Sequence, residues 1–147
     1  MILVDANLLI YAANRAAPEH ELARHWLDDR LSGSAAVGLP WHALLGFVRL
    51  ASNPAVVRNP VAPAAAMTQV QAWLACPPAW IPQPGGDHAT ILARLLVSPL
   101  ITSRLVPDAH LAALAIEHGL TLCSADGDFD KFPGLRWLNP LAAGIRR

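Results

Sequence analysis

The chain has 147 residues, a length that suits one domain able to bury roughly two thirds of its unfolded surface without disulfides. Hydrophobic residues make up 54% of it and charged residues 15%, an apolar composition that favours a partner covering part of the surface. The 11 basic and 11 acidic residues balance, so there is no basic field to indicate nucleic-acid binding. Charge alone neither supports nor excludes RNA as a ligand.

The sequence also argues against a membrane or secreted protein. No apolar run approaches the roughly 20 residues of a membrane-spanning helix, and the N-terminus lacks a basic flank and a small-residue cleavage site. We therefore expect a cytoplasmic protein with no membrane association. Cys76 and Cys123 lie among apolar residues without CxxC spacing, which favours two buried thiols over a disulfide or a metal site. The histidines are scattered, with no HExxH motif.

The first half of the chain alternates short aliphatic runs with segments of helical spacing. An apolar run before Asp5 predicts a strand, and apolar residues then recur at helical intervals. Pro40 opens a later helix, and Asn53-Pro54 closes it before a loop. We expect strands at 2–4 and 35–39, and helices at 8–13, 18–31, 41–50 and 63–75.

The second half continues the alternation. Gly119 is a C-terminal stop for a helix that Asp108 begins. We expect helices at 87–97 and 108–118, and short strands at 80–81, 120–123 and 135–137. Alternating strands and helices with short connections predict an α/β fold in which a mostly parallel sheet is covered on both faces. Residues 1–141 are expected to form a single domain, with 142–147 as a short tail.

Aspartates occupy the strand exits and helix entries of this scheme. Asp5 follows the apolar run 1–4, Asp108 opens its helix, and Asp126 and Asp128 lie in the turn after the predicted strand 120–123. Because the carboxyl ends of parallel strands meet at one edge of a sheet, we expect these acids to converge there. Carboxylates are hard ligands for Mg²⁺ or Mn²⁺, which can activate water and offset phosphate charge in phosphodiester hydrolysis. The pattern predicts a metal-dependent nuclease.

Each aspartate also has a purely structural interpretation. Asp5 is a favourable helix N-cap, Asp108 suits the dipole at a helix start, and Asp126 and Asp128 are common turn residues. The shared placement of all of them at one predicted sheet edge favours a site over coincidence.

The chain resembles PIN-domain proteins, and specifically the VapC-type toxin ribonucleases of bacterial type II toxin-antitoxin systems. The resemblance covers nearly the whole chain and rests on motifs that occur in the family's order. These are Ile2-Leu3-Val4-Asp5-Ala6-Asn7-Leu8-Leu9, Leu39-Pro40-Trp41 through Leu50-Ala51-Ser52-Asn53-Pro54, Val106-Pro107-Asp108-Ala109-His110-Leu111, and Ser124-Ala125-Asp126-Gly127-Asp128-Phe129 with Phe132-Pro133-Gly134-Leu135.

The resemblance implies a three-layer α/β/α sandwich and an Mg²⁺- or Mn²⁺-dependent endoribonuclease that cleaves RNA and so inhibits translation and growth. It implies a cognate VapB-type antitoxin and a homodimer as partners. Asp5, Asp108 and Asp126 match the family's catalytic metal ligands, and Asp128 matches a more variable catalytic acid. Asn7 and Ser124 match polar positions that support the acids through hydrogen bonds.

One departure from the family concerns the helix predicted at 41–50. The usual glutamate of that helix aligns with Gly46, and the only acid between Asp29 and Asp108 is Asp87. Its absence favours one tightly bound metal over two. It also leaves open a second hypothesis, a catalytically weak PIN-fold module that binds RNA or a partner. A third, a doubly wound small-molecule phosphatase, is disfavoured because Asn7 replaces its expected second acid.

Other residues carry weaker predictions about RNA and partners. Arg side chains near predicted loops are candidates for phosphate contacts, although a solvated or ion-paired role is the alternative. These are Arg15, Arg49, Arg58 and Arg104. The five tryptophans are expected to pack in the core or at an interface more readily than to stack on bases. The apolar helices around 22–31 and 41–50 are candidate docking surfaces.

Overall fold

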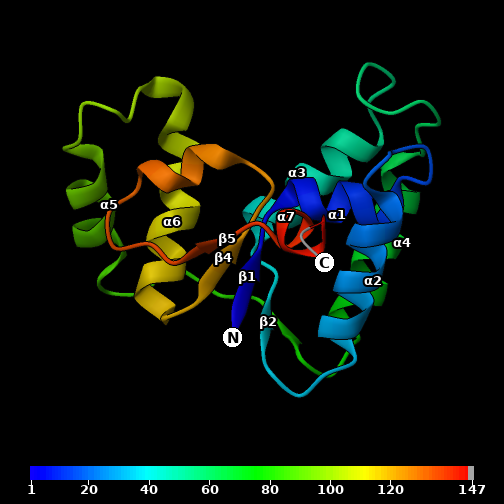
Figure 1. The fold of residues 1–147 in the computed structure, drawn as a ribbon, viewed down its shortest axis with the longest axis horizontal. Helices are drawn as coiled ribbons and strands as arrows, with labels where there is room; N and C mark the ends of the chain where they lie inside the picture. Colours follow the sequence, from blue (N-terminus) through cyan, green and yellow to red (C-terminus); the bar gives the residue numbers. More distant parts are fainter. Residues whose placement is uncertain (146–147) are drawn as a thin grey trace.

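The computed structural model describes residues 1–145 and contains a five-stranded sheet in which all neighbouring strands are parallel (Figure 1). The strand order is β3-β2-β1-β4-β5, which places β1 at the centre. The strands are two or three residues long: β1 Ile2–Val4, β2 Val37–Gly38, β3 Ala79–Trp80, β4 Thr121–Cys123 and β5 Trp137–Leu138. The predicted α/β class with a mostly parallel sheet is confirmed.

Successive side chains of β1 point to opposite faces of the sheet and begin two separate hydrophobic cores. Leu3 packs with α5 and α6 on one face, whereas Ile2 and Val4 pack with α1 to α4 on the other. Figure 1 shows these two groups of helices on opposite sides of β1. The helices are α1 Ala6–Ala13, α2 His20–Leu31, α3 Trp41–Ala51, α4 Pro63–Leu74, α5 His88–Leu96, α6 Val106–His118 and α7 Pro140–Ile145. Within residues 1–145, none of them is long and apolar enough to cross a membrane.

Several chain segments meet at the carboxyl edge of the sheet. Val4 pairs with Cys123, and the next backbone N–H, that of Asp5, donates to the Cys123 carbonyl at 3.0 Å. α1 begins directly after β1, and α3 begins three residues after β2 ends. α6 leads into β4 through a short turn at Gly119, so the first turn of α6 lies near the same edge. This edge therefore gathers residues that are up to 120 positions apart in the sequence.

Two glycines allow close approach between elements on this side of the sheet. A Cβ atom at Gly38 would lie 3.1 Å from Cγ of Pro82 and 3.2 Å from the Ile2 carbonyl oxygen. A Cβ atom at Gly46 would lie 3.1 Å from Cβ of Ala6, so Gly46 is where α3 packs directly on α1. At both positions an added Cβ atom would be closer to its neighbour than most Cβ contacts, so the neighbour would have to move by a few tenths of an ångström.

The structure differs from the sequence prediction mainly at element ends. β2 is limited to Val37–Gly38, and α6 begins at Val106 because Pro107 is tolerated in a first helical turn. Short 3₁₀ helices at Ser103–Leu105 and Gly127–Lys131 were not expected, and helix α7 occupies part of the predicted tail 142–147. The final two residues of that tail lie outside the described residues. Both cysteines are free, but only the Cys123 thiol is fully buried.

Replacing Gly38 by alanine is expected to lower the free energy of unfolding by about 1–3 kcal/mol, because the new methyl group overpacks the contact with Pro82 and the Ile2 carbonyl. Gly86→Ala is a matched control, since a Cβ atom there meets open space. Urea unfolding monitored by circular dichroism measures both. Equal stability of the two variants would show that β2 can move away from Pro82 at no cost.

Candidate active site

Asp5 has two roles at the end of β1. Its Oδ1 accepts a hydrogen bond from the Ala6 N–H at 2.7 Å, so Asp5 is the N-cap of α1. Its Oδ2 accepts a hydrogen bond from the Ser124 hydroxyl at 2.9 Å. The cap and the site are therefore not alternatives, because one carboxylate oxygen serves the helix while the other faces the loop after β4.

Ser124 joins the acids that follow β1 and β4. Its buried hydroxyl donates to Asp5 and accepts from the Asn7 side-chain amide and the Asp126 backbone N–H, both at 3.0 Å. Asn7 in turn accepts a hydrogen bond from the Ala125 N–H at 3.2 Å. One donor and two acceptor contacts use the full capacity of the hydroxyl. Asn7 and Ser124 thus hold the loop after β4 against the start of α1.

Asp108 lies in the first turn of α6 and faces the other acids. Its pKa is raised to about 6, chiefly by burial and then by the negative charges of Asp5, Asp126 and Asp128. The pKa of Asp5 is also raised, by burial first and by the charge of Asp126, although hydrogen bonds from Ser124 and Ala6 oppose the shift. The structure therefore brings all four predicted aspartates close enough to act on one another electrostatically.

Asp128 differs from the other acids because cations neutralise it locally. It accepts from Arg104 Nη1 at 3.1 Å and from Lys131 Nζ at 2.9 Å. The hydrogen bond from Lys131, followed by that from Arg104, lowers the pKa of Asp128. Asp126 instead caps the 3₁₀ helix, with Oδ1 accepting from the Asp128 N–H at 2.9 Å. Asp128 thus holds two cationic side chains at the rim of the acidic cluster.

The donor set fits a hard divalent cation bound partly through water. Asp5, Asp108 and Asp126 present carboxylate oxygens, and burial, followed by the charges of the neighbouring carboxylates, raises the pKa of Asp108 even though Arg104 opposes the shift. Among residues 1–145, no three His, Cys, Asp or Glu side chains converge closely enough to encircle a metal ion. Mg²⁺ does not need such a cage, because it usually keeps several waters and binds through one or two carboxylates.

The position of the missing glutamate lies against the start of α1. A Cβ atom at Gly46 would meet Cβ of Ala6, immediately after Asp5, at 3.1 Å, and no other atom from outside α3 within 4 Å. Asp87 does not replace the carboxylate. It is exposed at the start of α5, its backbone N–H bonds to Glu117, and its charge is not among those that shift the pKa of Asp5 or Asp108.

A histidine that sequence analysis did not single out lies beside the acids. His42 is exposed on α3, one helical turn before Gly46, and its positive charge lowers the pKa of Asp5 against the larger effect of burial. Its ring contacts that of His110 edge to face, with centroids 5.6 Å apart. His42 lies four residues before Gly46, so both residues are on the same face of α3. This spacing is the sequence signal that could have identified His42.

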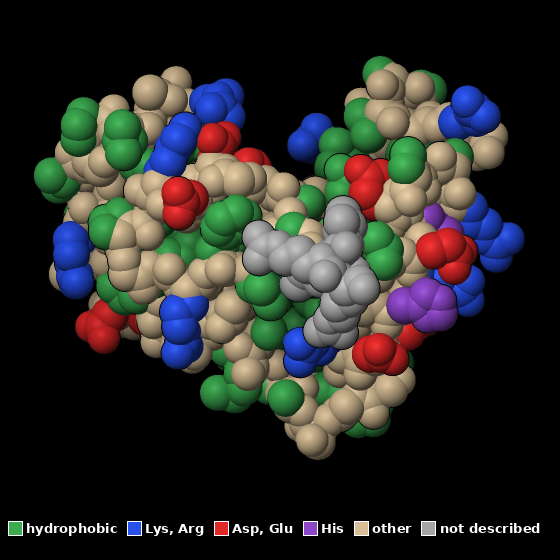
Figure 2. Space-filling model, viewed as in Figure 1, with side chains coloured by type: hydrophobic (Ala, Val, Ile, Leu, Met, Phe, Trp, Pro, Cys, Tyr) green, Lys and Arg blue, Asp and Glu red, His purple; other side chains and the backbone are tan. Residues whose placement is uncertain are grey.

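The surface is hollowed where these elements meet. Figure 2 shows a notch between the part of the molecule formed by α5 and α6 and the part formed by α1 to α4, with acidic side chains on both of its sides. A strand of substrate could therefore approach the carboxyl edge of the sheet from solvent.

The chain belongs to the PIN-domain family, because the family model for the PIN domain matches residues 2–135. Its relatives include Ribonuclease VapC37 of Mycobacterium tuberculosis, which is 47% identical over 142 residues, covering 97% of this chain and 99% of that protein. The resemblance to VapC-type PIN proteins that the motifs indicated is thereby confirmed.

Solved structures share the fold at low sequence identity. VapBC2 from Rickettsia felis bound to a DNA fragment from their promoter matches with a TM-score of 0.68 and 16% identity, covering 95% of this chain and 98% of that chain. VapC20 of Mycobacterium tuberculosis, a sarcin-ricin loop cleaving toxin, matches with a TM-score of 0.66 and 20% identity, covering 92% of this chain and 99% of that chain.

Replacing Asp108 by asparagine is expected to stabilise the metal-free protein at pH 7. A carboxyl pKa raised from 3.8 to about 6 means that the folded state binds more protons than the unfolded state, so wild-type stability falls as the pH rises through that interval. For a fully buried carboxyl, this pKa shift would correspond to roughly 3 kcal/mol of folding free energy at pH 7. Because Asp108 is partly exposed, we expect a gain of about 1 kcal/mol from the substitution. Thermal unfolding in EDTA between pH 3.5 and 8 measures the difference, which should vanish at the acid end.

The exposed pair of Asp28 with Arg24 on α2 provides the control, since Asp28→Asn removes a carboxylate without relieving a cluster. A variant at Asp108 that is no more stable than the wild type at pH 7 would contradict a cost of burying this carboxylate beside other negative charges.

Replacing Ser124 by alanine is expected to cost about 2 kcal/mol of folding free energy, because it leaves the Asn7 amide and the Asp126 N–H without their buried acceptor. It should also raise the pKa of Asp5 further, since the hydroxyl donates to that carboxylate. Chemical unfolding compared with Ser34→Ala, a change at an exposed loop position, measures the cost. A loss no larger than the control would mean that water takes over the hydroxyl's contacts.

Proposed function

We propose that this chain is an Mg²⁺- or Mn²⁺-dependent endoribonuclease and the toxin of a VapBC-type toxin-antitoxin system, which hydrolyses phosphodiester bonds in RNA to inhibit translation and growth. The observation that carries the proposal is that Asp5, Asp108 and Asp126, from three separate segments, lie close enough for their charges to affect one another, and that burial and these charges raise the pKa of Asp108 to about 6. The name and near full-length match of Ribonuclease VapC37 support it.

In this proposal Asp5, Asp108 and Asp126 hold the metal, which when bound offsets phosphate charge and makes a water nucleophilic near neutral pH. Ser124 and Asn7 fix the carboxylate of Asp5 relative to the loop that carries Asp126, by the hydrogen bonds described above. Fixed positions of the metal-binding oxygens matter because small displacements of reacting groups lower the reaction rate by large factors.

Asp128 contributes by orienting cations. It holds Arg104 and Lys131 at the rim of the cluster, and the Arg104 side chain is 68% exposed. Exposed guanidinium and ammonium groups at this position are suited to contact RNA phosphates on either side of the cleaved bond. Asp128 thus acts in catalysis as an outer helper, through the substrate-binding cations. The nuclease unit would comprise residues 1–141, with 142–147 as the C-terminal tail.

The proposed partners are a VapB-type antitoxin and a second copy of the chain, in the cytoplasm. The R. felis structure contains VapBC2, which supports an antitoxin partner for this fold. Apolar side chains are exposed on the two helices predicted to dock partners: Leu22 on α2, and Trp41 and Leu45 on α3. Leu45 is 59% exposed, which is unusual for leucine and is consistent with a covering partner.

A binding module without efficient catalysis is the second candidate, and Gly46 is the observation that favours it. The retained acids weigh against it, since Asp5, Asp108 and Asp126 still act on one another electrostatically. Growth arrest separates the two candidates. A toxin that acts by cleavage loses its effect with Asp5→Asn, whereas a pure binder is equally toxic or equally harmless in both forms.

Replacing Asp5 or Asp108 by asparagine is expected to lower cleavage of total RNA in Mg²⁺ or Mn²⁺ at least about 100-fold, because even groups that only support metal ligands are worth 10–100-fold. Asparagine preserves shape, and Asp28→Asn tests the effect of losing a remote carboxylate. Purified protein that cleaves RNA equally in all four forms, or cleaves in EDTA, would contradict the proposal.

A further inference from the structure

His42 occupies the β2 side of the acidic cluster. β2 is the neighbour of β1 in the sheet, and α3, which carries His42 in its first turn, begins at the carboxyl end of β2. The effect of its charge on Asp5 places the imidazole near that carboxylate. On the opposite side of the cluster, Arg104 acts on Asp108 in the same way. The imidazole of His42 and the guanidinium of Arg104 therefore lie on opposite sides of the acids.

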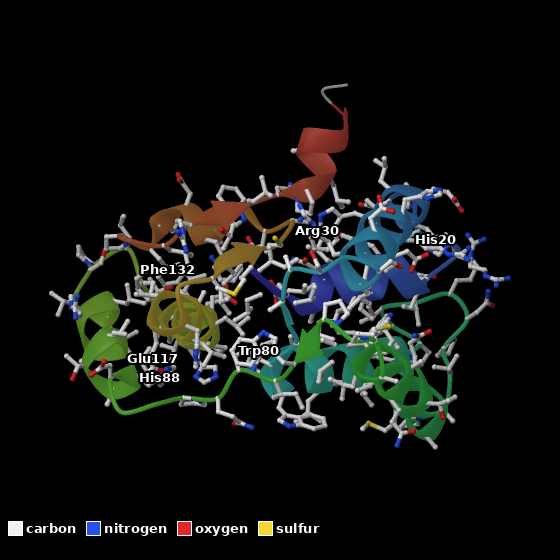
Figure 3. The ribbon with its side chains drawn as sticks, turned by 90° about the horizontal axis from the view of Figure 1, so that it is seen from below. His20, Arg30, Trp80, His88, Glu117 and Phe132 are labelled. Atoms are coloured by element: carbon white, nitrogen blue, oxygen red, sulfur yellow. The ribbon has the colours of Figure 1, made fainter. Side chains whose placement is uncertain are left out.

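The imidazole of His42 rests on a row of side chains that leads away from the site. His110 packs against His42, and its Nδ1 lies 3.1 Å from Nε2 of His88. The Nδ1 of His88 lies 3.9 Å from Oε1 of Glu117. Figure 3 shows His88 and Glu117 together between α5 and α6. These two side chains are only 12% and 11% exposed, so the far end of the row is well buried.

Glu117 is itself fixed by the loop before α5. Its Oε1 accepts from the Gly85 N–H at 2.9 Å, and its Oε2 accepts from the Asp87 N–H at 3.1 Å. These bonds lower the pKa of Glu117, that from Gly85 first, so the group is a carboxylate at neutral pH. A fixed negative charge at this end orients the neighbouring imidazoles.

The charge of Glu117 favours one set of proton positions along the row. A proton on Nδ1 of His88 would point toward the Glu117 carboxylate, 3.9 Å away, although this buried nitrogen has no hydrogen-bond partner among the described residues. Nε2 of His88 would then accept from Nδ1–H of His110, 3.1 Å away. The row therefore links Glu117, through His88 and His110, to the exposed imidazole of His42.

We propose that His42 is an RNA-contacting residue, whose imidazole N–H donates a hydrogen bond to a phosphate oxygen next to the cleaved bond, and that His110, His88 and Glu117 are its positioning residues. The inference rests on the proposed ribonuclease function and adds a substrate contact to it. Crowded carboxylates repel the RNA backbone. A donor on the β2 side, where Gly46 supplies no carboxylate, offsets that repulsion.

The test measures RNA binding separately from cleavage. Fluorescence anisotropy of a labelled single-stranded RNA of mixed sequence, titrated with the full chain in EDTA, reports binding without turnover. His42→Ala is expected to weaken binding about tenfold, the value of one charge-assisted hydrogen bond. His42→Gln retains an N–H donor and should recover part of the loss. His25→Ala, an exposed histidine on α2, is the control and should bind as the wild type does.

Kinetics and metal binding complete the test. With Mn²⁺, His42→Ala should raise KM about tenfold and change kcat by less than about threefold, because a binding contact is lost and the metal ligands remain. Glu117→Gln and His88→Asn should raise KM by smaller factors. Mn²⁺ affinity by calorimetry should be unchanged in His42→Ala.

Two results would overturn the inference: RNA binding by His42→Ala equal to that of the wild type, or a loss of Mn²⁺ affinity with RNA binding unchanged, which would make His42 a metal ligand. Because His42 is exposed, its replacement is not expected to unfold the chain, and matching thermal unfolding curves verify this. Failure of the wild type to cleave RNA would defeat the proposed nuclease instead, and the anisotropy comparison would still decide whether His42 binds RNA.

Discussion

The parallel pairing of β1 with β4 is the constraint on which the site depends. Val4 lies opposite Cys123, so the chain leaves both strands at the same level and delivers Asp5 and Ser124 side by side. The hydrogen bond between them then fixes the direction of the Asp5 carboxylate, and the backbone N–H of Asp126 is held by the same hydroxyl. A shift of one residue in this register would reverse the side-chain directions of β1 and place its core residues in the wrong layer.

The aspartates at this edge differ in how far nearby cations neutralise their negative charge, and this difference separates their roles. Asp128 has its own cations in Arg104 and Lys131, which lower its pKa. Asp5 and Asp108 have raised pKa values, chiefly because they are buried and in part because other carboxylates lie close to them. Such a cluster costs folding free energy until a cation or a proton neutralises it. We interpret the uncompensated members as the binding site proper and Asp128 as the support of its cationic rim.

The replacement of a glutamate by Gly46 changes the wall of the site on the β2 side. α3 packs closely on α1 at this glycine, and the imidazole of His42, one helical turn earlier on α3, acts electrostatically on Asp5. That wall therefore carries a hydrogen-bond donor instead of a further acceptor. The long row from His42 to Glu117 links this wall to the packing between α5 and α6, which suggests that the orientation of the imidazole depends on elements well outside the acidic cluster.

The sequence by itself determined most of the elements and the acids. Local signals were sufficient for these: Pro40 and Gly119 mark helix ends, the aliphatic run before Asp5 marks the central strand, and the spacing of the later aspartates marks further exits from the sheet. Such signals act over a few neighbouring residues, through backbone conformation and hydrophobic periodicity. They therefore do not depend on how the helices and strands later pack together.

Tertiary structure alone decided how distant residues combine. The strand order, the close approach of Gly38 to Pro82, the pairing of Arg104 with Asp128 and the row from His42 to Glu117 all join segments that no local pattern relates. Histidines that are scattered along the chain meet because His110 on α6 contacts both His42 on α3 and His88 on α5. The physical reason is that hydrogen bonds, ion pairs and ring contacts between side chains act only over short distances. Those distances are fixed only when the helices have packed on both faces of the sheet around β1.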